Sequence, residues 1–179
     1  MTDRARDALE VVVREVSPVE WSAYREVRLR ALETDPLAFG STRAREQAFS
    51  SERWKERISR GQNTSAGRTW VAVDLDGRFV GTAAFAADLE GTLRLFAMWV
   101  EPGSRGQGVG GRILDAALTW LHRVHPGLPV LLDVNPRQVA AVRLYESRGF
   151  QRTGATSSLD HTPGEVVVEM AVTPGADQA

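Results

Sequence analysis

The most informative stretch of this sequence is MWVEPGSRGQGVGGRIL, residues 98–114. An apolar, strand-like run comes first, and Gly106, Gly108, Gly110 and Gly111 then fall within six positions at the start of an amphipathic helical pattern. Each glycine costs a helix about 0.5–1 kcal/mol relative to alanine. Helix N-terminal amides attract anions, and a turn without β-carbons lets a phosphate group reach them. The stretch therefore predicts a phosphate-binding turn, with a tightly packed turn that binds nothing as the alternative.

Two other phosphate-binding motifs fit this turn less well. A nucleoside-triphosphate loop requires G-x-x-x-x-G-K-[ST], and no Lys-Ser or Lys-Thr pair follows these glycines. Gly106, Gly108 and Gly111 satisfy G-x-G-x-x-G, and Asp133 follows at about the twenty-residue distance of dinucleotide-binding folds. However, residues 101–105 separate the glycines from the strand, and the chain has one strand–helix–strand unit where that fold needs several. A dinucleotide-dependent oxidoreductase is therefore the weaker interpretation.

The hydrophobic pattern around the turn predicts an α/β fold with one central, largely antiparallel sheet flanked by helices. The expected order is β-α-α-β-β-β-α-β-α-β-β. Strands are expected at residues 9–16, in a pair within 68–87 joined across Asp76 and Gly77, and at 91–100, 128–134, 150–159 and 165–172. One helix is expected to start from a capping box at Ser17 and Glu20, and one or two short helices are expected within residues 35–61. The last helix is expected over residues 138–150 and is closed by Gly149. Another is expected after the glycine turn, with an apolar stripe formed by Ile113, Leu114, Ala117, Leu118 and Leu121.

Composition limits the classes of function. The chain has 179 residues, 42% of them hydrophobic and 25% charged, which fits a single domain over residues 1–179 with flexible ends at about 1–8 and 174–179. A net charge of −1 gives no basic field, so neither nucleic acid nor a membrane surface is an expected partner. Cysteine is absent, which excludes disulfides and a thiolate nucleophile. No secretory or membrane-spanning pattern is visible, so the expected location is the cytoplasm.

Two motifs suggest a family. RGQGVG, residues 105–110, resembles the R/Q-x-x-G-x-G/A motif of the GCN5-related N-acetyltransferase (GNAT) superfamily and follows a strand that ends in V-x-P. AAVRLYESRGFQRTG, residues 140–154, resembles the family's second signature, A-x-x-L-Y-E-x-x-G-F. Together the two motifs span residues 98–154, and the predicted element order agrees with the GNAT fold.

The resemblance implies that acetyl-coenzyme A binds with its diphosphate on the main-chain amides of the glycine turn and its pantetheine arm along a bulged strand at residues 97–100. It also implies that the Val100 amide polarises the thioester carbonyl and that Tyr145 protonates the departing thiolate. Gln138 stands where many members have asparagine, and Asn135 could make that contact instead. The residues expected to contact the coenzyme are Met98, Trp99, Val100, Arg105, Gly106, Gln107, Gly108, Val109, Gly110, Gly111, Asn135, Gln138 and Tyr145.

The acceptor side departs from the family pattern at Arg94, where many members have a glutamate that deprotonates the amine. The candidates to replace it are Glu46, Asp88, Asp133 and His161, and an amine that arrives neutral or loses its proton through water is the alternative. The residues expected to shape the acceptor site are Phe39, Glu46, Trp54, Phe85 and His161, with Glu46 recognising the amine as a cation. The alternative for Trp54 and Phe49 is that they close the core.

The resemblance predicts direct transfer of an acetyl group from acetyl-coenzyme A to a primary amine, with a small molecule as the expected acceptor, no metal, and a possible homodimer. His122 and His125 are expected to complement the end of their helix rather than bind metal. Two further functions stay open: a non-catalytic acyl-coenzyme A sensor or scaffold, and an acetyltransferase acting on protein N-terminal amines.

Overall fold

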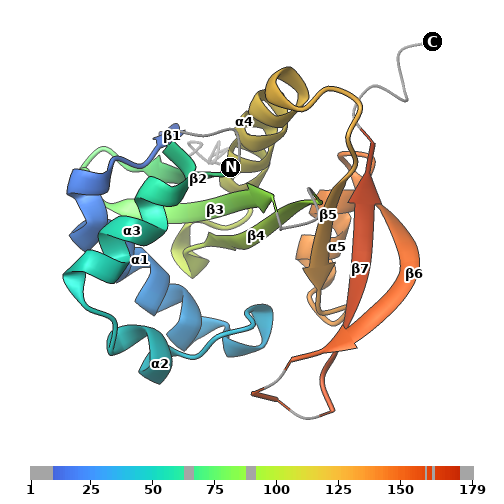
Figure 1. Cartoon of the computed structure of the whole chain (residues 1–179), viewed down its shortest axis with the longest axis horizontal. Helices are drawn as coiled ribbons and strands as arrows, with labels where there is room; N and C mark the ends of the chain where they lie inside the picture. The colour runs from blue at the N-terminus through green and yellow to red at the C-terminus, as the bar shows by residue number, and fades with distance from the viewer. Residues whose placement is uncertain (1–9, 63–66, 88–91, 160, 163, 174–179) are drawn as a thin grey trace, which may run out of the picture.

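The computed structural model describes residues 10–62, 67–87, 92–159, 161–162 and 164–173. These residues form a seven-stranded sheet in the order β1-β2-β3-β4-β5-β7-β6, with helices on both faces (Figure 1). The α/β fold and its largely antiparallel sheet are as predicted, and both α2 and α3 form in the segment expected to hold one or two helices. The elements are β1 (Val12–Glu15), η1 (Pro18–Glu20), α1 (Trp21–Thr34), η2 (Pro36–Ala38), α2 (Arg43–Gln47), α3 (Ser51–Gln62), β2 (Gly67–Val73), β3 (Phe79–Ala87), β4 (Leu93–Val100), η3 (Pro102–Ser104), α4 (Val109–Val124), β5 (Val130–Val134), α5 (Val139–Glu146), β6 (Gln151–Ser158) and β7 (Val166–Val172).

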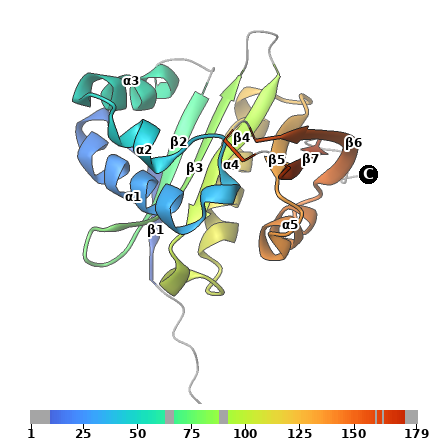
Figure 2. The ribbon, with the colours of Figure 1, turned by 90° about the horizontal axis from the view of Figure 1, so that it is seen from below.

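The two faces of the sheet carry separate hydrophobic clusters. Val71 of β2 packs with Tyr24 of α1 and Trp54 of α3, whereas its neighbours Trp70 and Ala72 pack against α4 on the opposite face. This alternation follows from the two-residue period of a strand. Figure 2 shows α1, α2 and α3 on one side of β2 and β3 and α4 on the other. The helices between β1 and β2 thus cover one face of the sheet, and α4, which follows β4, covers the other.

Several local signals in the sequence form as expected. The Glu20 carboxylate accepts the Ser17 N–H at 2.9 Å ahead of α1, and the Asp74–Gly77 turn joins β2 to β3 with Gly77 at φ 79°. The expected apolar stripe of α4 is buried. Gly149, at φ 83°, follows the end of α5. Strand β1 is shorter than the strand predicted over residues 9–16. The ends predicted to be flexible lie outside the described residues.

A bulge interrupts β4 at the residues where the family resemblance implied one. Thr82 is opposite Trp99 and Ala84 is opposite Phe96, so Ala83 alone faces both Ala97 and Met98. Ala97 has φ 55° and is the one non-glycine residue with positive φ in the described part of the chain. Such a conformation costs about 1–3 kcal/mol and is kept only where the surrounding structure imposes it. The bulge changes the direction in which the following amides point.

Strands β4 and β5 diverge soon after they meet. They pair in parallel at Leu93 with Val130 and at Arg94 with Leu131, and the described ladder ends there. On its other edge β5 stays paired with β7 as far as Val134, opposite Val168. The last residues of β4 and β5 therefore face each other across a cleft without sheet hydrogen bonds between them.

Candidate active site

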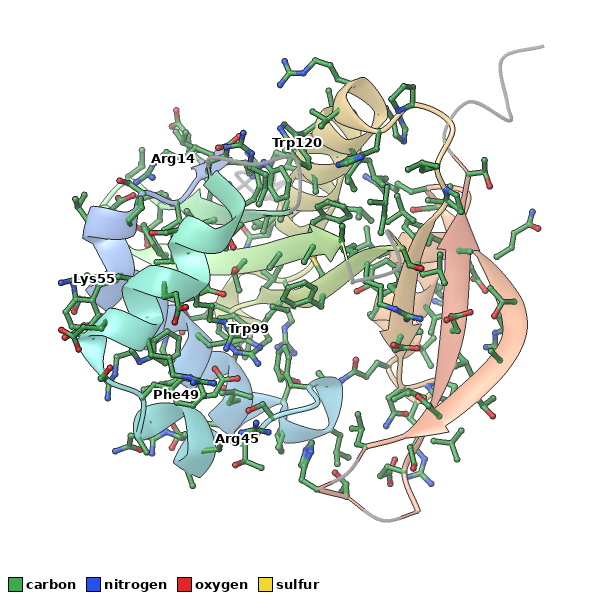
Figure 3. All side chains as sticks on the ribbon, viewed as in Figure 1. Arg14, Arg45, Phe49, Lys55, Trp99 and Trp120 are labelled. Atoms are coloured by element: carbon green, nitrogen blue, oxygen red, sulfur yellow. The ribbon has the colours of Figure 1, made fainter. Side chains whose placement is uncertain are left out.

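A cavity of about 1550 Å³ occupies this cleft and continues beneath the N-terminal helices. Its lining comes from α1, α2 and α3, from the ends of β2, β3 and β4, and from the glycine turn, β5 and α5. Figure 3 shows the side chains around it, with Arg45 and Phe49 near α2 and Trp120 on α4 at the other end of the molecule. The cavity is large enough for an extended ligand together with a smaller one, since pockets for single small molecules are about 300–1,000 Å³.

The four glycines of the turn serve two different purposes. Gly106 and Gly108 have φ values of 74° and 77°, a left-handed conformation that side chains disfavour, and a β-carbon on either would meet no described heavy atom within 4 Å. Gly110 packs closely, because its β-carbon would lie 3.3 Å from Leu144 Cδ2 and 3.4 Å from Met98 Cε. Gly111 lies under the Arg148 guanidinium. Two glycines thus shape an open turn, and two let α4 approach its neighbours.

The turn exposes main-chain amides toward the cavity. Helix α4 begins at Val109, and the first amides of a helix have no partner within it. The cavity lining includes Gly106 and the four residues from Gly108 to Gly111. Gln107 is outside the lining, and its Nε2 donates to the Gly103 carbonyl at 3.1 Å, so its side chain holds the loop. The geometry suits a diphosphate bound by backbone amides.

Arg105 lines the cavity, but its guanidinium is already engaged. Its Nε donates to the Val100 carbonyl at 2.8 Å, and its Nη2 lies 2.5 Å from Asp35 Oδ2. The same Asp35 oxygen accepts a hydrogen bond from Trp99 Nε1 at 2.7 Å. Asp35 at the end of α1 therefore ties the glycine turn to the end of β4, a link between segments that lie far apart in the sequence.

The end of β4 presents amides to the cleft. The Glu101 amide donates to the Val80 carbonyl on β3 at 2.8 Å, and N–H groups alternate sides along a strand. The amide of Val100 therefore points away from β3, toward the side where β5 has diverged. Val100 and Met98 both line the cavity. An extended, amide-containing ligand can bind such an edge like an added strand.

Tyr145 lies on α5 and lines the cavity from within the core. Its ring packs edge-on against Phe150, with centroids 5.8 Å apart. Burial raises the pKa of the Tyr145 phenol, so the group stays protonated at neutral pH. Gly110 of α4 contacts Leu144 beside it, which places α5 against the start of α4. The phenol therefore has a proton to donate inside the cavity, while the same burial makes it a weaker acid.

Asn135 and Gln138 both line the cavity at the end of β5. The Asn135 side chain is used locally: its Oδ1 accepts the Arg137 amide at 3.0 Å and its Nδ2 donates to Glu165 at 3.0 Å. Glu165 also pairs with the Arg137 side chain at 2.8 Å. Asn135 therefore anchors the loop before β7 to the end of β5, while Gln138 is the N-cap residue of α5.

Glu46 lines the cavity, where the acceptor was expected, but its carboxylate is already paired. It is buried, and its two carboxylate oxygens accept hydrogen bonds from Arg28 at 2.9 and 2.8 Å, with Arg57 at 3.5 Å. Burial acts to raise the pKa of this carboxyl, but the hydrogen bonds and charges of Arg28, with help from Arg57 and Ser41, outweigh it and lower the pKa. Two guanidinium groups already balance the negative charge of the Glu46 carboxylate. No unbalanced negative charge is left on Glu46 to recognise an amine cation.

The other expected acceptor residues separate into two groups. Phe39 and Phe85 line the cavity, and the Arg28 guanidinium lies 4.5 Å above the Phe39 ring. Trp54 lies outside the lining, fully buried against Tyr24 and Phe49, which agrees with the alternative that it closes the core. His161 is also outside the lining, with its Nε2 3.4 Å from the Pro36 carbonyl oxygen.

Among the candidate bases, Asp133 is the one that combines a place in the cavity lining with a raised pKa. Its carboxylate lies 3.2 Å from Arg94, whose guanidinium also reaches Glu169 at 3.0 Å. Partial burial raises the pKa of Asp133, Arg94 acts in the opposite direction, and Glu169 raises it further. Asp88 lies outside the described residues.

Arg28 is a site residue that sequence reasoning missed. It interrupts the apolar stripe of α1 one turn after Tyr24 and one turn before Leu32, and it is 4% exposed. A charged residue within a buried stripe is a sequence signal for an internal ion pair. Its partner, Glu46, is 18 residues away, so the pairing itself could not be read from the pattern.

Two features are absent from the part of the chain that the structure describes. In that part of the chain no group of three or more histidine, aspartate or glutamate side chains is arranged to hold a metal ion. No described helix combines the length and the apolar character that crossing a membrane requires.

Comparison with known proteins identifies the family. The sequence profile of the Acetyltransferase (GNAT) family matches residues 26–150, which is more than half of the chain. The chain therefore belongs to the acetyltransferase (GNAT) family, a class of acyltransferases.

Individual relatives cover parts of the chain or its fold. N-acetylaspartate synthetase of Rattus norvegicus is 40% identical over 92 residues, which is 49% of this chain and 29% of that protein. Peptidyl-lysine N-acetyltransferase YjaB of Salmonella typhimurium is 33% identical over 85 residues, 48% of this chain and 51% of that protein. This chain thus spans about half or less of these relatives. The structure of yncA, a putative acetyltransferase from Salmonella typhimurium with its cofactor acetyl-CoA, matches with a TM-score of 0.76 and 17% identity, covering 94% of this chain and 96% of that one, which is a likeness of fold.

Proposed function

We propose that this chain is an N-acetyltransferase that transfers an acetyl group from acetyl-coenzyme A directly to a primary amine. The observation that carries the proposal is the divergence of β4 and β5. It opens a cavity in which unpaired β4 amides, the glycine turn and Tyr145 share one lining. That combination offers an anion site, an extended backbone edge and a proton donor along one continuous space.

The chain's own residues account for binding of the coenzyme. Amides of the turn from Gly106 to Gly111 bind the diphosphate, with the first turn of α4 adding its partial positive charge. The amides and carbonyls of Met98 and Val100 pair with the pantetheine arm along the open edge of β4. Arg105 contributes by holding the turn against Asp35 and the Val100 carbonyl.

The chemical step follows from where these groups lie. The amine nitrogen attacks the thioester carbonyl carbon, and a β4 amide, that of Val100 or of Met98, donates a hydrogen bond to the developing oxyanion. When the C–S bond breaks, the thiolate takes the proton of the Tyr145 hydroxyl, which burial keeps protonated. The enzyme contributes mainly by orienting the two reactants, which can supply about 7–11 kcal/mol of the barrier.

Asp133 is the proposed acceptor of the proton that the attacking nitrogen loses. It replaces the glutamate that the family often has at position 94, where Arg94 instead pairs with the Asp133 carboxylate. Its raised pKa brings the carboxyl closer to neutral pH, which favours a role as proton acceptor. Glu46, locked between Arg28 and Arg57, is not proposed as a base.

The proposed acceptor is a small molecule. The name of N-acetylaspartate synthetase supports a small amine, and the enclosed position of Phe39 and Phe85 at the cavity wall agrees with one. The name of peptidyl-lysine N-acetyltransferase YjaB favours a second candidate, a protein amine. A non-catalytic coenzyme sensor is the third possibility.

Thiol release separates these functions. The test incubates the full chain with acetyl-coenzyme A and a panel of small amines and peptides. Free thiol and acetylated product are then measured. We expect thiol release with a small amine. A Tyr145→Phe variant should still bind acetyl-coenzyme A but have a kcat lower by about 10²-fold, the low end of what a positioned acid contributes. Binding of acetyl-coenzyme A without thiol release from any amine would support the sensor instead.

A further inference from the structure

The cavity is strongly cationic although the chain as a whole is not. Eight arginines and four carboxylates are among its described lining residues, whereas the net charge of the chain is −1. Two of the arginines, Arg105 and Arg137, lie beside the glycine turn and the start of α5. The other six come from the N-terminal helices and from β2 and β4, the side proposed for the acceptor. An excess of positive charge on that side is unexpected for a site that binds an amine cation.

The carboxylates of the cavity are mostly neutralised already. Asp35 pairs with Arg105, Glu46 with Arg28 and Asp133 with Arg94. Arg57 shares Glu46, while Arg68 and Arg94 reach the carboxylates of Glu15 and Glu169 behind the cavity wall. These pairs account for the positive charge of four of the six acceptor-side arginines.

Arg45 on α2 and Arg53 on α3 are the two that remain. Neither side chain makes an ion pair with any described residue, and both line the cavity. The Arg53 guanidinium lies 4.4 Å above the Phe49 ring, which restricts where it points without neutralising its charge. Both arginines are exposed at the edge of the cavity, so a ligand can reach them.

Arg28 supplies an independent observation deeper in the same cavity. Its Nε and Nη2 donate to Glu46, but its Nη1 is buried and has no hydrogen-bond partner among the described residues. A buried guanidinium nitrogen without an acceptor is costly, and native structures rarely keep one unless a ligand or water completes it. Arg28, whose Nη1 is this donor, lines the same cavity as Arg45 and Arg53.

We propose that the acceptor amine is an amino acid that carries carboxylate groups and that Arg45 and Arg53 bind a carboxylate at the helical end of the cavity. This rests on the proposed acetyltransferase function. Guanidinium groups match carboxylates in geometry and charge, and charge-assisted hydrogen bonds are the stronger kind. The site lies on α2 and α3, on the other side of β2 and β3 from α4, whose first turn belongs to the proposed diphosphate site. Arg45 and Arg53 are therefore not part of that diphosphate site.

The experiment compares acceptors that differ in charge and variants that differ in position. L-aspartate, L-aspartic acid diamide and 1,3-diaminopropane are offered to the full chain with acetyl-coenzyme A. Arg45→Gln, Arg53→Gln and the double variant are compared with Arg43→Gln and Lys55→Gln. Arg43 shares α2 with Arg45, and Lys55 shares α3 with Arg53, yet both lie outside the cavity lining, and Figure 3 shows Lys55 well away from Arg45.

We expect L-aspartate to be the best of the three acceptors. Each cavity variant should raise its KM at least about tenfold, equivalent to about 1.4 kcal/mol. The two control variants should stay within about twofold of the wild type, and the affinity for acetyl-coenzyme A should not change in any variant. Preference for the diamine or the diamide, or an unchanged KM in the double variant, would overturn the proposal.

A binding measurement keeps this inference separate from the proposed function. Calorimetric titration of the full chain with L-aspartate reports carboxylate binding without any turnover. Binding that Arg45→Gln and Arg53→Gln weaken, in a protein that releases no thiol, supports the carboxylate site while the proposed function fails. Thiol release with amines, together with no detectable binding of L-aspartate, means that the function holds and the carboxylate site is wrong.

Discussion

Gly108 and Gly127 have nearly the same backbone conformation, with φ 77° and 76°, and a β-carbon added to either would meet no described heavy atom within 4 Å. Alanine at either position should therefore cost a similar amount of folding free energy, about 1 kcal/mol. Gly108 lines the cavity and Gly127 does not. We expect Gly108→Ala to weaken acetyl-coenzyme A binding at least about tenfold because the methyl group occupies the approach of the diphosphate. Calorimetry of both variants tests this, and equal affinities would show that the turn does not bind the coenzyme.

The pairing of Asp133 with Arg94 leads to a prediction about how kcat depends on pH. If the Asp133 carboxylate accepts the proton, kcat at saturating amine falls as pH drops through its pKa. Partial burial raises that pKa and Arg94 counteracts the rise. Arg94→Gln removes the counteracting charge, so the acidic limb of kcat should move to higher pH, and Asp133→Asn should abolish it. Arg78→Gln, which removes an exposed ion pair outside the cavity lining, is the control and should leave the limb in place.

At the scale of elements, α1, α2 and α3 are joined by one buried carboxylate that pairs with two arginines. Arg28 of α1 and Glu46 of α2 are 4% and 1% exposed, and Arg57 of α3 reaches the same carboxylate. Glu46→Gln leaves a buried guanidinium without its counter-charge and should lower the free energy of unfolding by about 3–5 kcal/mol. Glu33→Gln breaks an exposed pair with Arg43 and should cost about 1 kcal/mol or less. Denaturant unfolding measures both.

The Glu46 pair also has a defined pH signature. Because the pKa of Glu46 is lower in the folded chain, the pair stabilises fully above the ordinary carboxyl pKa of 4.5 and loses its contribution as pH falls through the folded value. Glu46→Gln should remove that acid-dependent part of the stability while leaving kcat of the folded protein unchanged. A collapse of kcat with unchanged stability would return Glu46 to the role of a base.

The elements predicted best from sequence are those with local causes. The Asp76-Gly77 turn, the stripe of α4 and the glycine end of α5 each depend on residues within a few positions, and all three form as expected. The resemblance to a family also placed the β4 bulge correctly. The pairing of Arg28 with Glu46, the link from Arg105 to Asp35, and the burial of Trp54 arise from contacts between distant segments, which a single sequence does not encode by spacing.

At the scale of the whole molecule, the coenzyme should act as a stabilising ligand. Acetyl-coenzyme A at about one hundred times its dissociation constant adds about 2.7 kcal/mol to the free energy of unfolding. For a chain of this length each kcal/mol raises Tm by about 2–4 °C, so a rise of about 5–10 °C is expected. NADH at the same concentration should give no shift. A shift with NADH and none with acetyl-coenzyme A would favour the dinucleotide interpretation.

The short parallel ladder between β4 and β5 has a mechanical consequence. Within the described strands two residue pairs join them, whereas β2 to β3 and β5 to β7 are paired along their lengths. The sheet thus consists of two panels, one of β1, β2, β3 and β4 and the other of β5, β7 and β6 (Figure 1). The two panels meet at a narrow seam, the short ladder between β4 and β5. A small rotation about that seam would spread the panels where the reactants meet while every long ladder stays intact. We expect the spent coenzyme to depart by such a hinge motion, without the fraying of any strand.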